Sequence, residues 1–368
     1  MAKAPADPDF DLKNQRPSAG EMRSFATGQA LFLAPLPLPT GHAPMDLGGS
    51  FLEVNDTYLD VGQSNFNKAF QAQLMIWVLM CVLISCLIVL PLVELAMFFG
   101  DPHERTFMTH VMSMLEGLRF YSLLALLGGG FIAILGCYSV ISTTLQKART
   151  RPMRFNRQRR EVALVYRGEA PIYVPWEEVI ACVSASQIIT QYAVMPSFAL
   201  MLGLRNADTG DVYWVTIPGG NLGLVVSEWE AIRVYMEQGP AALPVPVLSD
   251  EEFQEGTVAY FHMCRQVYRK EHWWPRYAFG FLVIQFCSGW TLPCHIAQWV
   301  NRRPKAVFPQ AVLDWSQPMP SEQHATPSEA LLKESAEVRK AYAQGQTMLD
   351  YYKARFTEPA AETAAVAD

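Results

Sequence analysis

Two adjacent carboxylates and two spaced histidines are the residues whose types could do acid–base or metal chemistry. Glu177 and Glu178 stand together in VPWEEV, and His103 and His110 are seven residues apart. Neighbouring strand residues point to opposite faces, so the two carboxylates do not converge as an acid and a base. Two histidines without a third ligand make a weak metal site. We therefore predict neither a catalytic carboxylate pair nor a bound metal.

The chain also lacks the short motifs that carry common enzyme chemistry. It contains no GxSxG, P-loop, HExxH or glycine-rich dinucleotide turn. Its seven cysteines form no CxxC pair, and most lie in apolar runs, which is typical of reduced, buried thiols. We predict a non-enzymatic protein with no catalytic, cofactor-binding or metal-ligating residues, although catalytic groups can converge from distant positions without a motif.

The composition indicates a membrane protein. Of 368 residues, 51% are hydrophobic and 17% are charged, against about 25% charged in an average soluble domain. The apolar excess collects in three runs. Two of them, 74–93 and 120–142, hold no charged residue, and crossing a bilayer takes about 20 apolar helical residues. We predict two transmembrane helices, at 74–99 and 120–146.

Small residues recur along one face of the second predicted span, at Ala125, Gly129 and Ala133. Such a face lets two helix backbones approach closely. The first span is the expected partner because only the short loop 100–119 separates the two. Packing against a second copy of the chain, in a homo-oligomer, is the alternative.

A dense block of positive charge follows the second span, although the chain carries a net charge of −6. It comprises Lys147, Arg149, Arg151, Arg154, Arg157, Arg159 and Arg160. Short loops rich in lysine and arginine stay in the cytoplasm, so the block predicts a cytoplasmic body and a periplasmic loop 100–119. The same charges predict contact with anionic membrane lipids at the surface. A pI near 5.7 argues against nucleic acid as a partner.

The third apolar run, 277–300, has basic residues on both sides and contains Gln285, Pro293 and Gln298. Both of its ends therefore prefer the same side of a membrane, which a single crossing does not satisfy. We favour a re-entrant or interfacial segment that turns at SGWTLP over a segment that crosses.

The pattern changes after the basic block. EVALVYRG and PIYVPWEEVIACVSA predict strands, and RNADTGD predicts the turn of a hairpin. A helix capped by Ser227 and Glu230 follows. We predict a membrane α+β fold, in which a two-helix transmembrane hairpin joins a small cytoplasmic antiparallel β domain with flanking helices. The order of elements is similar to that of pleckstrin-homology-like domains, at the level of fold alone.

The remaining segments complete the predicted organisation. The last helix bears an apolar stripe that docks either on its own protein or on a partner. The boundaries are a flexible Pro-rich arm 1–50, a pre-membrane segment 51–73, the two spans with their loop, a β-rich domain 147–248, a helix 249–276, the third apolar segment 277–300, a Pro-rich linker 301–325, an amphipathic helix 326–356 and an acidic tail 357–368.

The motif PMRFNRQRREV followed by VPWEEV, with NDTYLDV before the first span, resembles a proteobacterial family of inner-membrane proteins defined by a domain of unknown function. The resemblance covers roughly residues 50–310. Members are often encoded near type VI secretion loci. The resemblance thus implies an accessory or immunity factor in the inner membrane, whose partner is a secretion component or an effector.

Two aromatic residues of the motif have a physical interpretation of their own. We expect Phe155 to point into the core and Trp176 to pack on the helix that follows Ser227, so that both act structurally. For the whole protein, two other functions stay open beside the interaction protein. These are a structural scaffold in a membrane complex and a toxin or enzyme that acts on the membrane.

Overall fold

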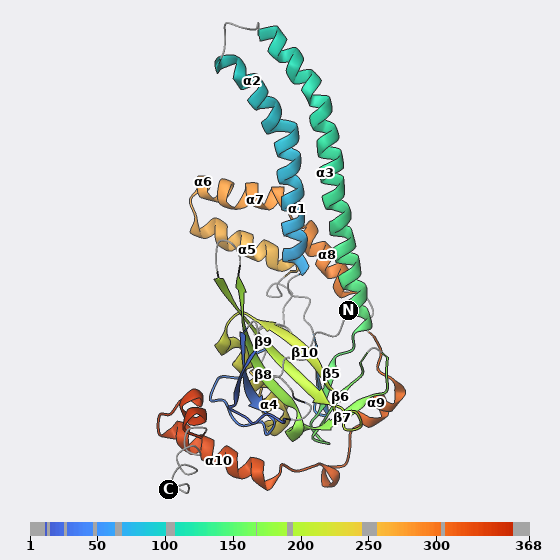
Figure 1. Ribbon diagram of the computed structural model, residues 1–368, viewed down its shortest axis with the longest axis vertical. Helices are drawn as coiled ribbons and strands as arrows, with labels where there is room; N and C mark the ends of the chain where they lie inside the picture. Colours follow the sequence, from blue (N-terminus) through green and yellow to red (C-terminus); the bar gives the residue numbers. More distant parts are fainter. Residues whose placement is uncertain are drawn as a thin grey trace. The chain divides into compact units, whose positions relative to one another are not determined.

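The computed structural model describes residues 12, 15–25, 28–46, 50–62, 68–100, 107–166, 168–189, 194–244, 256–302 and 306–355 (Figure 1). The chain divides into two compact units, which are described separately. Unit 1 comprises residues 1–64, 149–246 and 305–368, and unit 2 comprises residues 65–148 and 247–304. The chain therefore leaves unit 1 twice and returns to it twice.

The described residues of unit 1 form two five-stranded antiparallel sheets. The first has the strand order β1-β2-β8-β9-β10 and the second the order β3-β4-β5-β6-β7. The first sheet consists of β1 (Met22–Phe25), β2 (Gly28–Ala34), β8 (Ile180–Ile189), β9 (Val194–Arg205) and β10 (Val212–Gly219). The second consists of β3 (Phe51–Val54), β4 (Tyr58–Val61), β5 (Met153–Asn156), β6 (Glu161–Leu164) and β7 (Ile172–Pro175).

The prediction of a mixed α and β fold is confirmed, but that of a single small sheet is wrong. The motif VPWEEV marks the point where the chain passes between the two sheets. Its β7 ends at Pro175, a 3₁₀ turn occupies Trp176–Glu178, and β8 begins at Ile180 in the other sheet. The turn carries the chain from the second sheet to the first, so β7 and β8, which follow each other in sequence, do not pair.

The N-terminal arm is likewise not a flexible extension in its described part. Strand β2 pairs with β8, and its Phe32 and Leu33 are fully buried. The Pro and Gly content of residues 1–50 suggested an arm, but the run Ala30–Ala34 is a strand whose partner lies about 150 residues away in the chain. Periodicity does not reveal such a distant partner.

Helix α4 (Leu222–Gln238) covers the core of unit 1. Its N-cap is Asn221, whose side chain accepts a hydrogen bond from the Leu224 amide. The predicted start at Ser227 is wrong, because Ser227 is buried inside the helix. The helix ends at Gly239, its C-cap, which adopts a φ of 93°. The hairpin of β9 and β10 around Asn206 is confirmed too.

The last part of the chain docks on unit 1. Helix α10 (Glu329–Ala343) begins at the cap Ser328, and the helix breaks at Gly345, so the predicted single helix 326–356 is two. Its Leu331 and Val338 are buried in the main core, as is Tyr352. The stripe thus covers its own protein. A short helix α9 (Gln310–Trp315) lies in the predicted linker.

Unit 2 contains two helices long and apolar enough to span a membrane, as predicted. One runs over 26 residues, Lys68–Val93, and comprises α1 (Lys68–Ile84), a π-helical stretch (Ser85–Val89) and the start of α2 (Leu90–Gly100). The other is α3 (Phe107–Arg149). Because α3 begins at Phe107, much of the predicted loop 100–119 is helical.

The small residues of α3 face α1. A Cβ added to Gly129 would lie 3.3 Å from the side chain of Leu79, and one added to Gly136 would overlap Met75. Ala125 on the same face is buried. Gly130, the next residue of the helix, has no atom within 4 Å of such a Cβ among the described residues. One side of α3 thus admits the neighbouring helix closely, while the other is open.

The remaining helices of unit 2 are shorter and lie beside α1, several of them crosswise to it (Figure 1). Helix α5 (Val258–Glu271) has Thr257 as its N-cap, and the predicted start at Ser249 lies outside the described residues. It is followed by α6 (Trp274–Tyr277), a π-helical stretch (Ala278–Val283), α7 (Ile284–Cys287) and α8 (Leu292–Asn301). The helix breaks between Cys287 and Leu292, within the predicted turn, with a bend of 49°.

Replacing Gly129 by leucine should separate α1 from α3, because the new side chain has no room beside Leu79. The matched control is Gly130→Leu, which changes the same residue type in the same helix on the open side. We expect the thermal midpoint of the detergent-solubilised protein to fall for Gly129→Leu and to stay within a few degrees for Gly130→Leu. Equal midpoints would contradict the close packing of α1 on this face.

Candidate functional site

The centre of the second sheet is an ion pair between neighbouring strands. Arg154 on β5 and Asp60 on β4 are direct cross-strand partners. The guanidinium donates two hydrogen bonds to the carboxylate, from Nε to Oδ1 at 2.6 Å and from Nη2 to Oδ2 at 2.7 Å. Both side chains are about 95% buried. This bidentate pair joins residues on either side of the whole 65–148 excursion.

Aromatic rings hold the Arg154 guanidinium from both sides. Its central carbon lies 3.6 Å from the ring centre of Tyr58 and 4.4 Å from that of Phe308. Its Nη1 donates a hydrogen bond to Oγ of Ser316 at 3.0 Å. Burial opposes the charge, but the hydrogen bonds and the charge of Asp60 raise the pKa of Arg154 on balance. The side chain thus stays charged and ties three chain segments together.

A second buried arginine, Arg160, joins the turn after β5 to helix α4. Its Nη2 donates to Glu237 at 2.8 Å and to Glu177 at 3.3 Å. The same Glu237 oxygen accepts a hydrogen bond from the indole of Trp176 at 2.9 Å. Arg160 adopts a φ of 51°, and its carbonyl accepts a bond from the Trp176 amide. The basic block and VPWEEV are therefore parts of one network.

The aromatic residues of the motif lie where the sequence suggested. Phe155 and Trp176 are fully buried and meet edge to face, with ring centres 5.9 Å apart. Trp176 also contacts Trp229 of α4 at 5.3 Å. Three large rings thus fill the space between the second sheet and α4, with the Glu237 carboxylate at their edge.

Three further cations of the block contact unit 1 itself. Arg151 Nε donates to the carbonyl of Val307 at 2.8 Å, and Arg159 Nε donates to that of Trp315 at 2.9 Å. The guanidinium of Arg157 lies 3.1–3.4 Å from the position of a Cβ on Gly239. The side chains of Lys147 and Arg149, at the end of α3, are outside the described residues.

The expectation that the whole block contacts lipid is wrong for Arg154 and Arg160. Their side chains are buried in ion pairs and are not available to head groups. Basic residues after an apolar run are typical of a membrane surface, but a charged side chain also joins two strands when a carboxylate lies opposite. The sidedness that the block predicts is set during insertion and stays a prediction.

The carboxylate pair does not lie on a strand. Glu177 and Glu178 occupy the 3₁₀ turn between the sheets. Glu177 accepts hydrogen bonds from Arg160 and from the Ser328 amide, whereas Glu178 forms an exposed ion pair with Arg16 at 3.9 Å. His103 and the side chain of His110 lie outside the described residues. Among the residues that are described, no three potential ligands group as a metal site.

Helix α4 carries two more buried carboxylates. Glu230 accepts hydrogen bonds from Arg233 on the same helix and from the backbone amide and hydroxyl of Thr40. Glu228 accepts a short hydrogen bond from the Ser50 hydroxyl. Burial raises the pKa of Glu228 to about 7, with Asp46 adding to the rise and Ser50 opposing it. Both carboxylates therefore bind the chain between β2 and β3 to α4.

The partners of these arginines, above all Asp60 and Glu237, were not predicted from the sequence. The available signal was a lone acid in the apolar strand YLDV and a lone base in MRFN. A single charge inside a buried strand requires an opposite charge nearby. The sequence alone does not indicate which strands are neighbours in the sheet.

Comparisons of the chain with protein-family models, with curated proteins and with solved structures find no match. The resemblance carried by PMRFNRQRREV and VPWEEV therefore stays a hypothesis.

Removing the charge of Asp60 should destabilise the protein strongly. In Asp60→Asn the buried guanidinium of Arg154 loses its counter-charge, which costs about 3–5 kcal/mol. This lowers the thermal midpoint by roughly 10 °C in a body of this size. Glu178→Gln is the matched control, because its pair with Arg16 is more than half exposed and is worth less than about 1 kcal/mol. Similar midpoints for the two variants would show that the buried pair does not hold the sheet.

Proposed function

We propose that this protein is a non-enzymatic interaction protein anchored in the bacterial inner membrane, with unit 1 as its cytoplasmic binding body. The observation that carries the proposal is the insertion of the apolar hairpin between two paired strands. Strand β4 ends at Val61, β5 begins at Met153, and these two residues are partners in the same sheet. The segment between them holds both span-competent helices.

This arrangement favours an anchor over a membrane-embedded catalyst. The hairpin leaves and re-enters the body at adjacent points of one sheet, so the body lies at the hairpin's ends. An even number of crossings is required, because a bilayer cannot separate two hydrogen-bonded strands. Two crossings match the two candidate helices and the predicted sidedness of the basic block.

The use of buried charge within the fold of unit 1 also supports a non-enzymatic role. Asp60 pairs with Arg154, Glu237 with Arg160, and Glu230 with Arg233. The first two pairs join different elements, and Glu230 also holds Thr40. These buried ionisable groups therefore have a structural role, as contacts that stabilise the fold.

Within that role, the resemblance to proteins encoded near type VI secretion loci suggests an accessory or immunity factor. Such a factor binds a secretion component or an effector at the cytoplasmic face. A scaffold subunit and a membrane-acting toxin or enzyme are the competing functions, and the experiment below separates them from the leading one.

The test is a competition between a deletion strain and its parent in dense contact. An immunity factor protects its own cell, so we expect the deletion strain to be killed by the parent and to be rescued by the wild-type gene. A variant in which 65–148 is replaced by a short Gly/Ser loop should keep β4 and β5 paired but should not rescue, because it lacks the anchor.

Equal survival of the deletion strain and the parent would rule out immunity. Purification of the tagged full-length protein from native membranes then decides between the remaining functions. A secretion component in near-equal amount would support the accessory role, whereas a defined homo-oligomer alone would favour the scaffold. Altered lipids on overexpression would favour the enzyme.

A further inference from the structure

The second excursion of the chain, 247–304, also begins and ends on unit 1. Residues on both of its sides pack together there, since Arg151 bonds the Val307 carbonyl and Phe308 covers Arg154. Helix α10 beyond it lies in the same core as α4. If the excursion crossed a membrane once, these parts would lie on opposite sides. It therefore crosses an even number of times.

Two crossings do not fit the lengths of the helices. The apolar pieces run over Trp274–Cys287 and Leu292–Val300, which are 14 and 9 residues. Each is far shorter than the about 20 residues that a helical crossing needs. The excursion consequently makes no complete crossing, and its apolar surface must be accommodated on one side of the bilayer.

Helices α5 and α6–α7 form a compact hairpin, here called the aromatic hairpin (residues 258–287). Its inside is made of rings, with Phe261, Tyr268 and Tyr277 all contacting Phe281 at ring-centre distances of 5.4–6.0 Å. Arg265 Nε donates a hydrogen bond to the Tyr277 hydroxyl at 2.9 Å. The two arms are thus fixed to each other.

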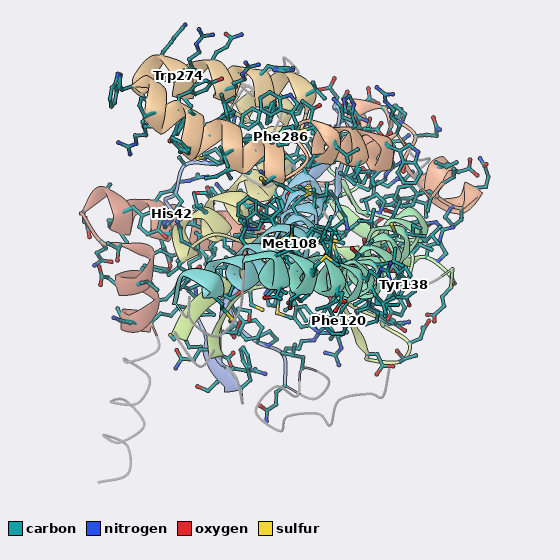
Figure 2. All side chains as sticks on the ribbon, turned by 90° about the horizontal axis from the view of Figure 1, so that it is seen from above. His42, Met108, Phe120, Tyr138, Trp274 and Phe286 are labelled. Carbon is teal, nitrogen blue, oxygen red and sulfur yellow. The ribbon has the colours of Figure 1, made fainter. Side chains whose placement is uncertain are left out.

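The outside of the aromatic hairpin has two different faces. The α6–α7 arm exposes Phe279, Val283 and Phe286, at a spacing that places them on one side of a helix, and Phe279 is 74% exposed. Figure 2 labels Phe286 on this arm and Trp274 near its start. The α5 arm exposes mostly polar side chains, Gln266, Arg269, Lys270 and Glu271, with Val267 as an apolar one.

The tip between the two arms combines aromatic and basic side chains. Trp273 and Trp274 are 80% and 65% exposed. Around them lie Arg269, Lys270 and Arg276, all exposed, against the single acid Glu271. Exposed tryptophans beside cations are the composition that suits the head-group region of a bilayer.

The aromatic hairpin meets α1 where the apolar run of that helix begins. Gln73 Nε2 donates a hydrogen bond to Gln285 Oε1 at 2.9 Å, and Gly289 lies against Ile76. Gln73 is the last polar residue before the uncharged run 74–93. This contact sets the α6–α7 arm at the level where the predicted span enters the membrane.

We propose that the aromatic hairpin lies in the plane of the bilayer surface and binds anionic phospholipid. Phe279, Val283 and Phe286 face the acyl chains, and Trp273 and Trp274 lie at the head groups. Arg269, Lys270 and Arg276 bind the lipid phosphates. The proposal rests on the membrane anchoring described above, but it does not depend on the identity of the protein partner.

Depth is tested on the full-length protein in nanodiscs of phosphatidylcholine and phosphatidylglycerol, made with lipids brominated either near the head group or near the chain end. The difference in fluorescence between the wild-type protein and the double variant Trp273→Phe/Trp274→Phe gives the signal of the two tip tryptophans. We expect that signal to be quenched most by bromine near the head group. The control is Trp315 of unit 1, whose indole donates a hydrogen bond to Glu161. Its signal is the difference between the wild-type protein and Trp315→Phe, and we expect it not to be quenched.

Lipid class is tested by the phosphatidylglycerol that remains with the protein after mild detergent purification. The triple variant Arg269→Gln/Lys270→Gln/Arg276→Gln should retain at least about fivefold less phosphatidylglycerol than the wild-type protein. The control, Lys333→Gln/Arg339→Gln/Lys340→Gln, removes three exposed charges from α10 and should retain the wild-type amount.

The outcomes are distinguishable. Extraction of the wild-type protein from membranes by alkaline carbonate would overturn the anchor and this proposal together. A carbonate-resistant protein whose tip tryptophans are not quenched would overturn this proposal alone. Quenched tryptophans with equal lipid retention in both triple variants would contradict the binding of anionic lipid.

Discussion

The pairing of β4 with β5 is the constraint on which the rest of the structure depends. These strands are adjacent in space, yet the whole apolar hairpin is inserted between them in sequence. The pairing brings the two ends of that insertion together, so the membrane anchor that we propose crosses the bilayer an even number of times. The same restriction applies to the aromatic hairpin, because the chain that follows it packs into the core of unit 1.

The ion pair on these strands is well suited to that task because arginine, not lysine, supplies the charge. A planar guanidinium makes two parallel hydrogen bonds to Asp60 and still offers its faces to Tyr58 and Phe308. Its remaining nitrogen reaches Ser316, next to α9. One side chain therefore joins segments from before the first excursion, after it, and after the second.

Local features of the sequence predicted local structure well. Uncharged apolar runs identified both span-competent helices, and the small residues of α3 lie toward α1. The aromatic residues Phe155 and Trp176 were correctly expected in the core. In each case the signal was contained in one short stretch, as helix length, residue size or strand alternation.

Features that depend on distant partners were not predictable in this way. Strand β2 was mistaken for a flexible arm because its partner β8 lies far along the chain. The basic block was interpreted by composition, although Arg154 and Arg160 are buried by Asp60 and Glu237. The start of α4 was misplaced because Ser227 and Glu230 form a capping pattern, whereas the true cap is Asn221. Long-range pairing decided the first two cases, whereas the third was decided by a local cap three residues from its partner Leu224.

The most direct test of the central claim is the sidedness of the two ends of the body and of the hairpin tip. Reporter fusions that are active on one side of the inner membrane only can be placed after residue 368, after residue 246 and within 101–106. The account predicts cytoplasmic activity at residues 246 and 368 and periplasmic activity at 101–106. Opposite sides for residues 246 and 368 would contradict it, because one folded body cannot lie on both sides of a membrane.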